Sequence, residues 1–239
     1  YVYRHNGSSW QQEAYLKSSN SDVDDKFGSS VAISNDTLIV GAPHEDSDAT
    51  GVYNGTSYPA DNSGGIDGAV YVFARTGTTW NQQAVLKQGP GANAGFSFGD
   101  VIAISGDSVI VGVYNDAGTE TAVANGTMGP SGSSGALSGA AYIFKRTGTT
   151  WAQQAYVKPS NREDFDEFAR GAVGISNDMA VVGAVREDSA TSIILNGSSA
   201  AIDNDSIDSG AAYVFRRTGN TWVQSAYLKA SNASAGDLF

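Results

Sequence analysis

The sequence predicts an all-β fold built from one repeated antiparallel sheet of four short strands. The first observation is internal repetition, because three kinds of landmark residue recur at spacings of 70 or 71 positions. The second is that no window shows the 3.6-residue apolar period of an amphipathic helix. The landmarks are Trp10, Trp80, Trp151 and Trp222; Phe27, Phe98, Phe168 and Phe239; and Gly41, Gly112 and Gly183.

Four strand-like runs make up the first complete repeat. They cover residues 27–34, 37–43, 68–75 and 79–87, and each is rich in β-branched or aromatic residues and bounded by Gly, Asn or Asp. Gly77 stands where a tight hairpin needs a positive φ. The runs are alternating or continuously apolar, which is expected when both faces of a sheet pack on neighbouring sheets.

A repeat of four antiparallel strands is typical of a β-propeller blade, whose two faces are covered by the adjacent blades. Residues 1–239 are therefore expected to form one partial propeller with blades of about 71 residues. We expect a half-blade holding third and fourth strands at 1–20, full blades at 27–88, 98–159 and 168–230, and the start of another blade at 231–239. The residues expected to pack between blades are Trp10, Trp80, Trp151, Trp222, Phe27, Phe98 and Phe168.

Three and a half blades do not close a ring, since propellers have about four to eight. The remainder of a longer chain, or further copies of this one, is expected to complete the propeller. A compact soluble monomer of 24.7 kDa would contradict this expectation.

Several phrases resemble the FG-GAP repeat family, which includes the integrin α-subunit propeller, and are most similar to its bacterial extracellular branch. They are Phe27-Gly28 and Phe98-Gly99 for FG, Gly41-Ala42-Pro43 for GAP, and a third-strand phrase that reads GAVYVF, GAAYIF and GAAYVF. The resemblance implies a propeller that binds ligands at a cell surface. The third repeat departs from it, because Phe168 is followed by Ala169.

The integrin-type calcium loop between the first two strands is missing. That link is only Asn35-Asp36, Gly106-Asp107 or Asn177-Asp178, too short to supply the six to eight oxygens that Ca²⁺ takes, so we expect hairpin turns there. A Ca²⁺ site could instead form in the long connection between the second and third strands, if its acidic ends meet. The candidate ligands are Glu45, Asp46, Asp48, Asp61, Asp67, Glu187, Asp188, Asp203, Asp205 and Asp208. A solvated acidic loop with Asx-turns is the simpler alternative.

Two further polar features recur with the repeat. Asn-Gly occurs at Asn54, Asn125 and Asn196, which suits a turn with a left-handed residue and also gives three candidate N-glycosylation sites. An acid two positions before the phenylalanine, at Asp25, Asp166 and Asp237, is expected to cap a turn.

The composition narrows the classes of function. A net charge of −11 repels nucleic acid and anionic membranes, no apolar run is long enough to span a bilayer, and the absence of Cys removes disulfides and thiol chemistry. Neither a catalytic motif nor a phosphate loop is present, so no enzymatic activity is expected.

We therefore expect a non-catalytic adhesion or binding module, outside the cell or on its surface, that recognises protein or glycan through its inter-strand loops. One alternative is a structural spacer in a large surface protein. Another is the propeller domain of a secreted enzyme acting on polysaccharides.

Overall fold

The computed structural model describes residues 1–59, 64–89 and 98–239, and its elements in these ranges are all β-strands. The half-blade consists of β1 (Val2–His5) and β2 (Trp10–Ala14). The first blade holds β3 (Ser30–Ser34), β4 (Thr37–Ala42), β5 (Val52–Asn54), β6 (Ala69–Thr76) and β7 (Thr79–Leu86). The second holds β8 (Val101–Ser105), β9 (Ser108–Val113), β10 (Ala124–Asn125), β11 (Ala140–Thr147) and β12 (Thr150–Val157). The third holds β13 (Phe168–Ser176), β14 (Met179–Ala184), β15 (Leu195–Asn196), β16 (Ala211–Thr218) and β17 (Thr221–Leu228).

The all-β class and the antiparallel pairing of the four main strands are confirmed, but each full blade has a fifth strand that was not predicted. The first blade has the order β3-β4-β6-β7-β5, and the other two follow the same pattern. The fifth strand is the middle of the long connection, which returns along the sheet and pairs with the outermost main strand. Such pairing satisfies backbone groups that would otherwise leave an open sheet edge.

The short link between the first and second strands is a hairpin turn in all three blades, as expected. Its first residue is left-handed, with φ of 53° at Asn35, 55° at Gly106 and 53° at Asn177. The aspartate that follows pairs with an arginine near the end of the third strand. These pairs are Asp36–Arg75, Asp107–Arg146 and Asp178–Arg217.

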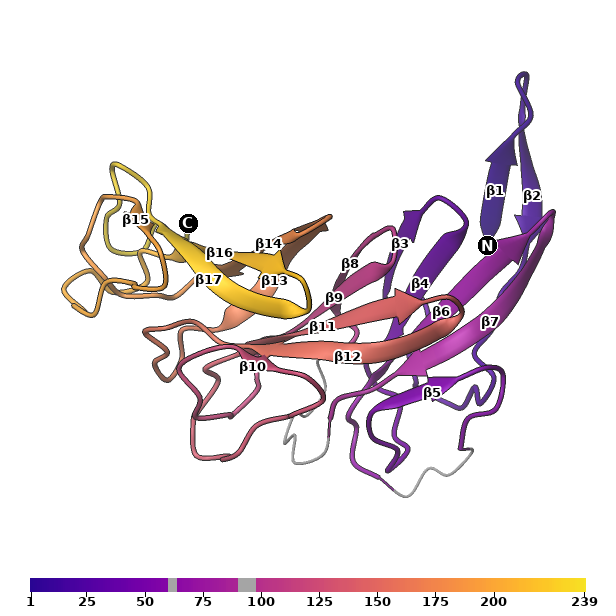
Figure 1. The fold of residues 1–239 in the computed structure, drawn as a ribbon, viewed down its shortest axis with the longest axis horizontal. Helices are drawn as coiled ribbons and strands as arrows, with labels where there is room; N and C mark the ends of the chain where they lie inside the picture. The colour runs from indigo at the N-terminus through magenta and orange to yellow at the C-terminus, as the bar shows by residue number, and fades with distance from the viewer. Residues whose placement is uncertain (60–63, 90–97) are drawn as a thin grey trace.

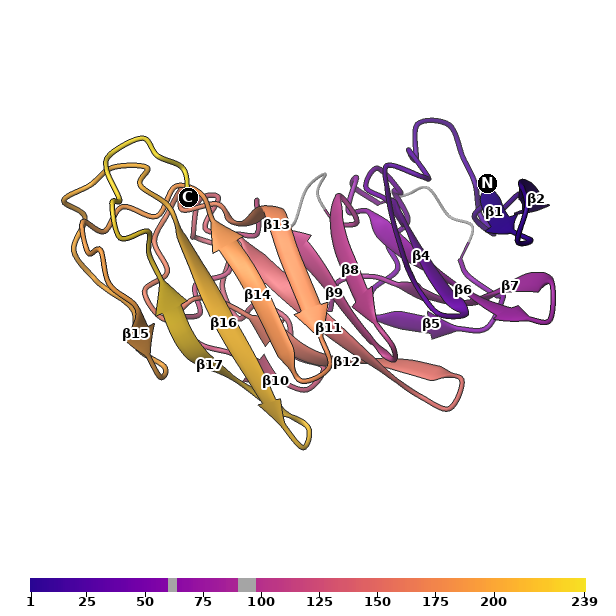
Figure 2. The ribbon, with the colours of Figure 1, turned by 90° about the horizontal axis from the view of Figure 1, so that it is seen from above.

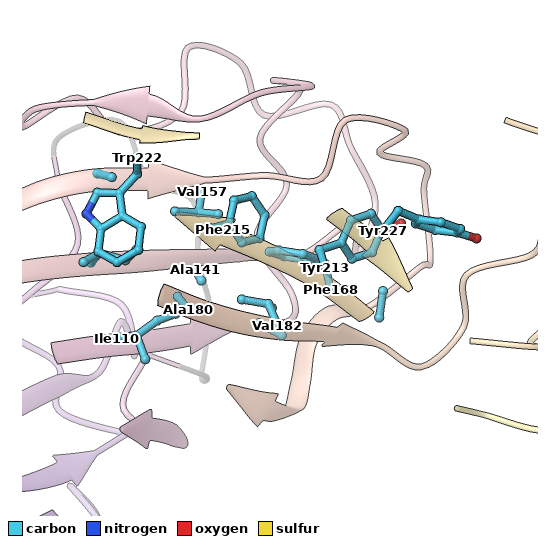
Figure 3. Close-up of a cluster of buried hydrophobic side chains, with 14 of the residues drawn as sticks. Ile110, Ala141, Val157, Phe168, Ala180, Val182, Tyr213, Phe215, Trp222 and Tyr227 are labelled. Atoms are coloured by element: carbon cyan, nitrogen blue, oxygen red, sulfur yellow. The ribbon is translucent and has the colours of Figure 1, made fainter. Parts of the chain in front are cut away.

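Successive sheets lie side by side in an open row, with the two termini at opposite ends (Figures 1 and 2). One apolar core lies between the first and second blades and another between the second and third. In the second of these cores, Ile110 and Ala141 of one sheet face Val182, Phe215 and the other aromatic residues of the next (Figure 3). The sheets do not close into a ring.

Burial of the repeated tryptophan depends on whether a complete blade precedes it. Trp151 and Trp222 are 1% and 0% exposed, Trp80 is half-buried, and Trp10 is 70% exposed. The prediction of Trp10 as a core residue is therefore wrong for this structure, because no sheet covers it. Phe98 and Phe168 are fully buried, whereas Phe27 is only half-buried.

The two ends of the row expose faces whose equivalents are buried inside it. At the N-terminal end, Tyr1 and Tyr3 are 75% and 55% exposed, whereas Tyr213 and Phe215 at the matching positions are fully buried. At the C-terminal end, Val181 on β14 is 42% exposed. Each end therefore presents apolar surface of the kind that joins blades elsewhere in the chain.

Candidate functional site

The connections after the second and fourth strands gather at one end of the sheets, which we call the loop end. Antiparallel pairing requires this, because the first-to-second and third-to-fourth hairpins turn at the opposite, hairpin end (Figure 2). Among the described residues, every Asp and Glu lies in loop-end connections except Glu13, Asp36, Asp107 and Asp178. Those four pair with arginines, so the unbalanced negative charge belongs to the loop end.

One acid in each long connection is buried and bonded to a lysine that follows the fourth strand. Nζ of Lys87 lies 2.5 Å from Glu45 Oε2, and Nζ of Lys229 lies 2.7 Å from Glu187 Oε2. The second blade uses Lys158 and Asp116, 3.0 Å apart and both fully buried. Burial lowers the pKa of Lys158, and the Asp116 carboxylate opposes that shift.

These ion pairs engage Glu45 and Glu187, two of the residues expected as Ca²⁺ ligands, and their role as ligands stays a prediction. Lys87 and Lys229 neutralise the two carboxylates, and Asn20 and Asn161 donate to them at 2.9 and 3.1 Å. The sequence does hold a signal for this arrangement. In every full repeat an acid precedes the lysine by 42 positions, at 45 and 87, 116 and 158, and 187 and 229.

The remaining Ca²⁺ candidates lie in loops that fold back as expected, yet they do not converge on one point. The N–H of Gly68 donates to Glu45 O and that of Gly210 to Glu187 O, both at 2.9 Å, so the two ends of the connection do meet. Within residues 1–59, 64–89 and 98–239, no three His, Asp or Glu side chains form a group that could hold a metal ion. Asp61 lies outside these ranges, and Ca²⁺ binding stays a prediction.

Most of these acids have other roles in the loops. Asp203 accepts from the N–H of Ala190 at 2.7 Å, which lowers the pKa of its carboxyl, and Asp188 accepts from the N–H of Asp208 at 2.8 Å. Burial raises the pKa of Asp67, and Asp48 adds to that shift. Asp46 is partly buried, with one carboxylate oxygen unpartnered, and Asp205 is exposed.

The repeated Asn-Gly motif joins neighbouring blades. Asn54 donates to the backbone O of Trp151 at 3.0 Å and accepts from its N–H at 2.7 Å, and Asn125 does the same with Trp222. The left-handed turn residue is the glycine, with φ of 94° at Gly55. An N-glycan would attach to the side-chain nitrogen, which at Asn54 and Asn125 donates the hydrogen bond to the tryptophan backbone. N-glycosylation of Asn54, Asn125 and Asn196 stays a prediction.

A groove of about 410 Å³ lies between the first and second blades, next to the Asn54 contact and toward the hairpin end. Its walls come from the β6–β7 hairpin and from the turn that joins β11 to β12. The lining includes Asn81, Gln82, Gln83, Thr149 and Thr150. This site was not predicted, because the polar hairpin residues that form it look like ordinary solvent-exposed strand ends in the sequence.

The model of the FG-GAP repeat family matches residues 10–73 and 151–215, which together make up more than half of the chain. The chain belongs to the FG-GAP repeat family. Neither curated proteins nor solved structures gave a match. FG-GAP repeats form propeller-like blades and often serve in binding or adhesion, and they are typical of extracellular or surface proteins.

In this FG-GAP chain, the two motifs for which the family is named meet at each blade junction. A Cβ on Gly41, the GAP glycine of the first blade, would lie 1.9 Å from the carbonyl O of Gly99, the FG glycine of the second. Gly99 is left-handed, at φ 99°, and its carbonyl accepts from Ser30 Oγ at 2.5 Å. Ala169 occupies the equivalent place in the third blade at φ 71°, a conformation that disfavours alanine.

The FG phenylalanine also docks its backbone on the preceding blade. Gly139, left-handed at φ 76°, forms a parallel bridge with Phe168, and a Cβ on Gly139 would lie 2.0 Å from Phe168 O. Gly68 approaches Phe98 in the same way, with 2.1 Å to its O. Glycine is therefore required immediately before the third strand.

The acid ahead of the FG phenylalanine caps a turn, as expected, and in the first and third blades it is buried. Asp166 accepts from the N–H of Glu163 at 3.1 Å. Burial, joined by the nearby carboxylates of Glu187, Glu163 and Asp188, raises the pKa of Asp166 to about 7, although the hydrogen bond from the N–H of Glu163 opposes the shift.

We expect Asp166→Asn to remove a pH dependence of stability. The pKa of Asp166 is higher in the folded chain than in the unfolded chain, so wild-type stability falls as pH rises from about 4 to above 7. At pH 8 the variant should be more stable by on the order of 2–4 kcal/mol, and at pH 4 the two should be equal. Thermal melts from pH 4 to 8 measure this, with the exposed Asp205→Asn as the control for loss of one charge. A variant that follows the wild-type pH profile would contradict it.

Proposed function

We propose that this chain is a non-catalytic recognition module that acts outside the cell or on its surface and binds a basic partner through its loop end. The observation that carries the proposal is the segregation of charge. The hairpin end pairs its four acids with arginines, whereas the loop end holds all the other described carboxylates. A surface of one sign attracts the opposite sign and raises the rate of encounter.

Buried ion pairs in the described part of the loop end support this function. The buried pairs Lys87–Glu45, Lys158–Asp116 and Lys229–Glu187 tie each long connection to the end of its own sheet. Exposed acids such as Asp48 and Asp205 are then presented on a fixed frame. Loops held in this way bind with less loss of conformational entropy than free loops do.

The same contacts favour binding over catalysis. The most deeply buried loop-end acids are neutralised by lysines, and their side chains have almost no surface open to a substrate. The described residues hold no helix that is long and apolar enough to cross a bilayer.

The proposal is tested by biolayer interferometry against a panel of purified extracellular proteins that spans basic and acidic pI. We expect saturable binding to basic members, weakened at least about tenfold between 50 and 300 mM NaCl. Asp48→Asn with Asp205→Asn should weaken binding further than Ser9→Lys with Asn220→Lys, which adds the same charge at the hairpin end.

Two results would count against a basic partner at the loop end. Equal losses in the two double variants would assign binding to net charge alone. No saturable binding to any member of the panel would favour a structural spacer.

A further inference from the structure

The groove between the first two blades is built to hold a fixed shape. Four hydrogen bonds cross the junction beside it, and they leave little freedom to either wall. Asn54 makes two of them with the backbone of Trp151. Gln83 Oε1 accepts the other two, from Trp151 Nε1 at 2.8 Å and from Arg146 Nη1 at 3.1 Å. A preorganised polar groove binds a small ligand with a smaller ordering cost than a flexible one.

One wall of this groove carries an unused hydrogen-bond acceptor. Gln82 Oε1 is buried and has no hydrogen-bond partner among the residues that the structure describes, and Gln82 Nε2 makes a long contact of 3.5 Å with Gly55 O. The equivalent glutamines of the other blades are better bonded. Gln153 donates to Met128 O at 2.7 Å, and Gln224 accepts from the N–H of Ser160 at 3.1 Å. A buried acceptor without a donor costs about 1–3 kcal/mol. Because the Gln82 side chain is partly exposed, a turn of its amide toward the groove would let a ligand hydroxyl recover that cost.

The remaining lining selects the chemistry of that ligand. Asn54, Asn81 and Gln83 add amides, and Thr76, Thr149 and Thr150 add hydroxyls; none of the residues lining the groove is charged. Amides and hydroxyls both donate and accept, so they suit a neutral molecule with many hydroxyl groups. The volume, about 410 Å³, lies within the range of roughly 300–1,000 Å³ that small-molecule sites occupy.

We propose that this groove is a binding site for a neutral saccharide, with Gln82 Oε1 accepting a hydrogen bond from a sugar hydroxyl. The site lies toward the hairpin end and is independent of the acidic loop end, so either can fail without the other. Its binding should be insensitive to salt, because no charge takes part.

The groove recurs one repeat earlier with a different lining. A pocket of about 590 Å³ between the half-blade and the first blade contains Gln12 and Thr78, which match Gln82 and Thr149. Arg4 and Glu13 replace Ala74 and Gln83 there. The fold therefore offers this position at successive blade junctions, and the uncharged lining distinguishes the junction between the first and second blades.

The test is saturation-transfer NMR followed by titration, with a panel of neutral disaccharides of hexoses and of N-acetylhexosamines. At least one member should bind the wild-type chain with the same Kd at 50 and 300 mM NaCl. Gln82→Ala should weaken that Kd about tenfold. Gln82→Glu keeps an acceptor at this place and should retain most of the affinity. Asn220→Ala, at the position that matches Thr149 one blade later, should have no effect.

The proposal fails if no disaccharide gives a transfer signal, or if Gln82→Ala binds as the wild type does. It also fails if Asn220→Ala weakens binding equally, or if only neutral peptides bind in a parallel panel. Unchanged melting temperatures of Gln82→Ala and Gln82→Glu exclude unfolding as the cause of a loss. If Gln82→Ala alone lowers the melting temperature, its loss of binding cannot be separated from unfolding. The Kd of Asn81→Ala then tests the site, and a Kd equal to that of the wild type would contradict the proposal.

Discussion

Lys158→Met should destabilise the chain by about 3–5 kcal/mol, because it leaves the Asp116 carboxylate buried without its cation. The lysine ammonium also donates to Ser138 Oγ at 2.8 Å and to Gly139 O at 2.6 Å, and methionine can replace neither bond. Tyr156 still donates to Asp116 at 2.6 Å, but a hydroxyl does not balance the charge. Urea unfolding followed by tryptophan fluorescence measures the loss.

The chain supplies its own control for this experiment. Lys17 stands at the same position of the half-blade, where it is exposed and lies over the ring of Tyr15. Lys17→Met should therefore change the free energy of unfolding by less than about 0.5 kcal/mol. Combining Lys158→Met with Asp116→Asn should recover much of the lost stability, since no buried charge then remains. Equal effects of the two lysine substitutions would contradict the importance of the buried pair.

Gly139→Ala should have an effect of similar size, for a different reason. The left-handed backbone at φ 76° costs alanine about 1–2 kcal/mol, and its Cβ would lie 2.0 Å from Phe168 O, so the two blades would have to move apart. Overpacking of this kind adds about 1–3 kcal/mol. The expected total is about 2–5 kcal/mol of lost stability, read from the same urea titration.

Gly148→Ala separates the two contributions. Gly148 is also left-handed, at φ 63°, but no atom lies within 4 Å of the place its Cβ would take. The Gly148→Ala variant should therefore lose only the stability that corresponds to the strained left-handed backbone, about 1–2 kcal/mol. A Gly139→Ala variant no less stable than Gly148→Ala would show that the contact with Phe168 does not hold the blades together.

The sequence was most informative where the pattern is local. The four main strands of the first blade were expected at 27–34, 37–43, 68–75 and 79–87, and the structure places them within a few residues of these bounds. The alternation of apolar and polar residues and the turn residues that end it span only a few positions, so they can be recognised in a single sequence. The fifth strand was not predicted, because segments of two or three residues such as Ala124–Asn125 are too short to show the two-residue apolar period of a strand.

The functional residues were harder to predict because their roles depend on burial and on distant partners. The pairing of Glu45 with Lys87 was not predicted, because the two residues lie 42 positions apart and only the constant spacing across the repeats indicates the contact. Trp10 lies in a local phrase similar to that of Trp222, yet Trp10 is exposed and Trp222 is buried. Gln82 and Gln153 lie in similar phrases, yet their side chains make different hydrogen bonds. Whether a neighbouring sheet packs over a residue decides its burial and its partners. The residues next to it in the sequence do not indicate whether such a sheet is present.

Contacts limited to adjacent sheets also shape how the chain unfolds. The middle sheet is covered on both faces, whereas the β1–β2 hairpin is covered on one. Stability in such a linear array is a sum of unit and nearest-neighbour terms. Amide hydrogens in β9 and β11 should thus exchange with solvent most slowly, and those at either extremity should exchange by fraying long before global opening.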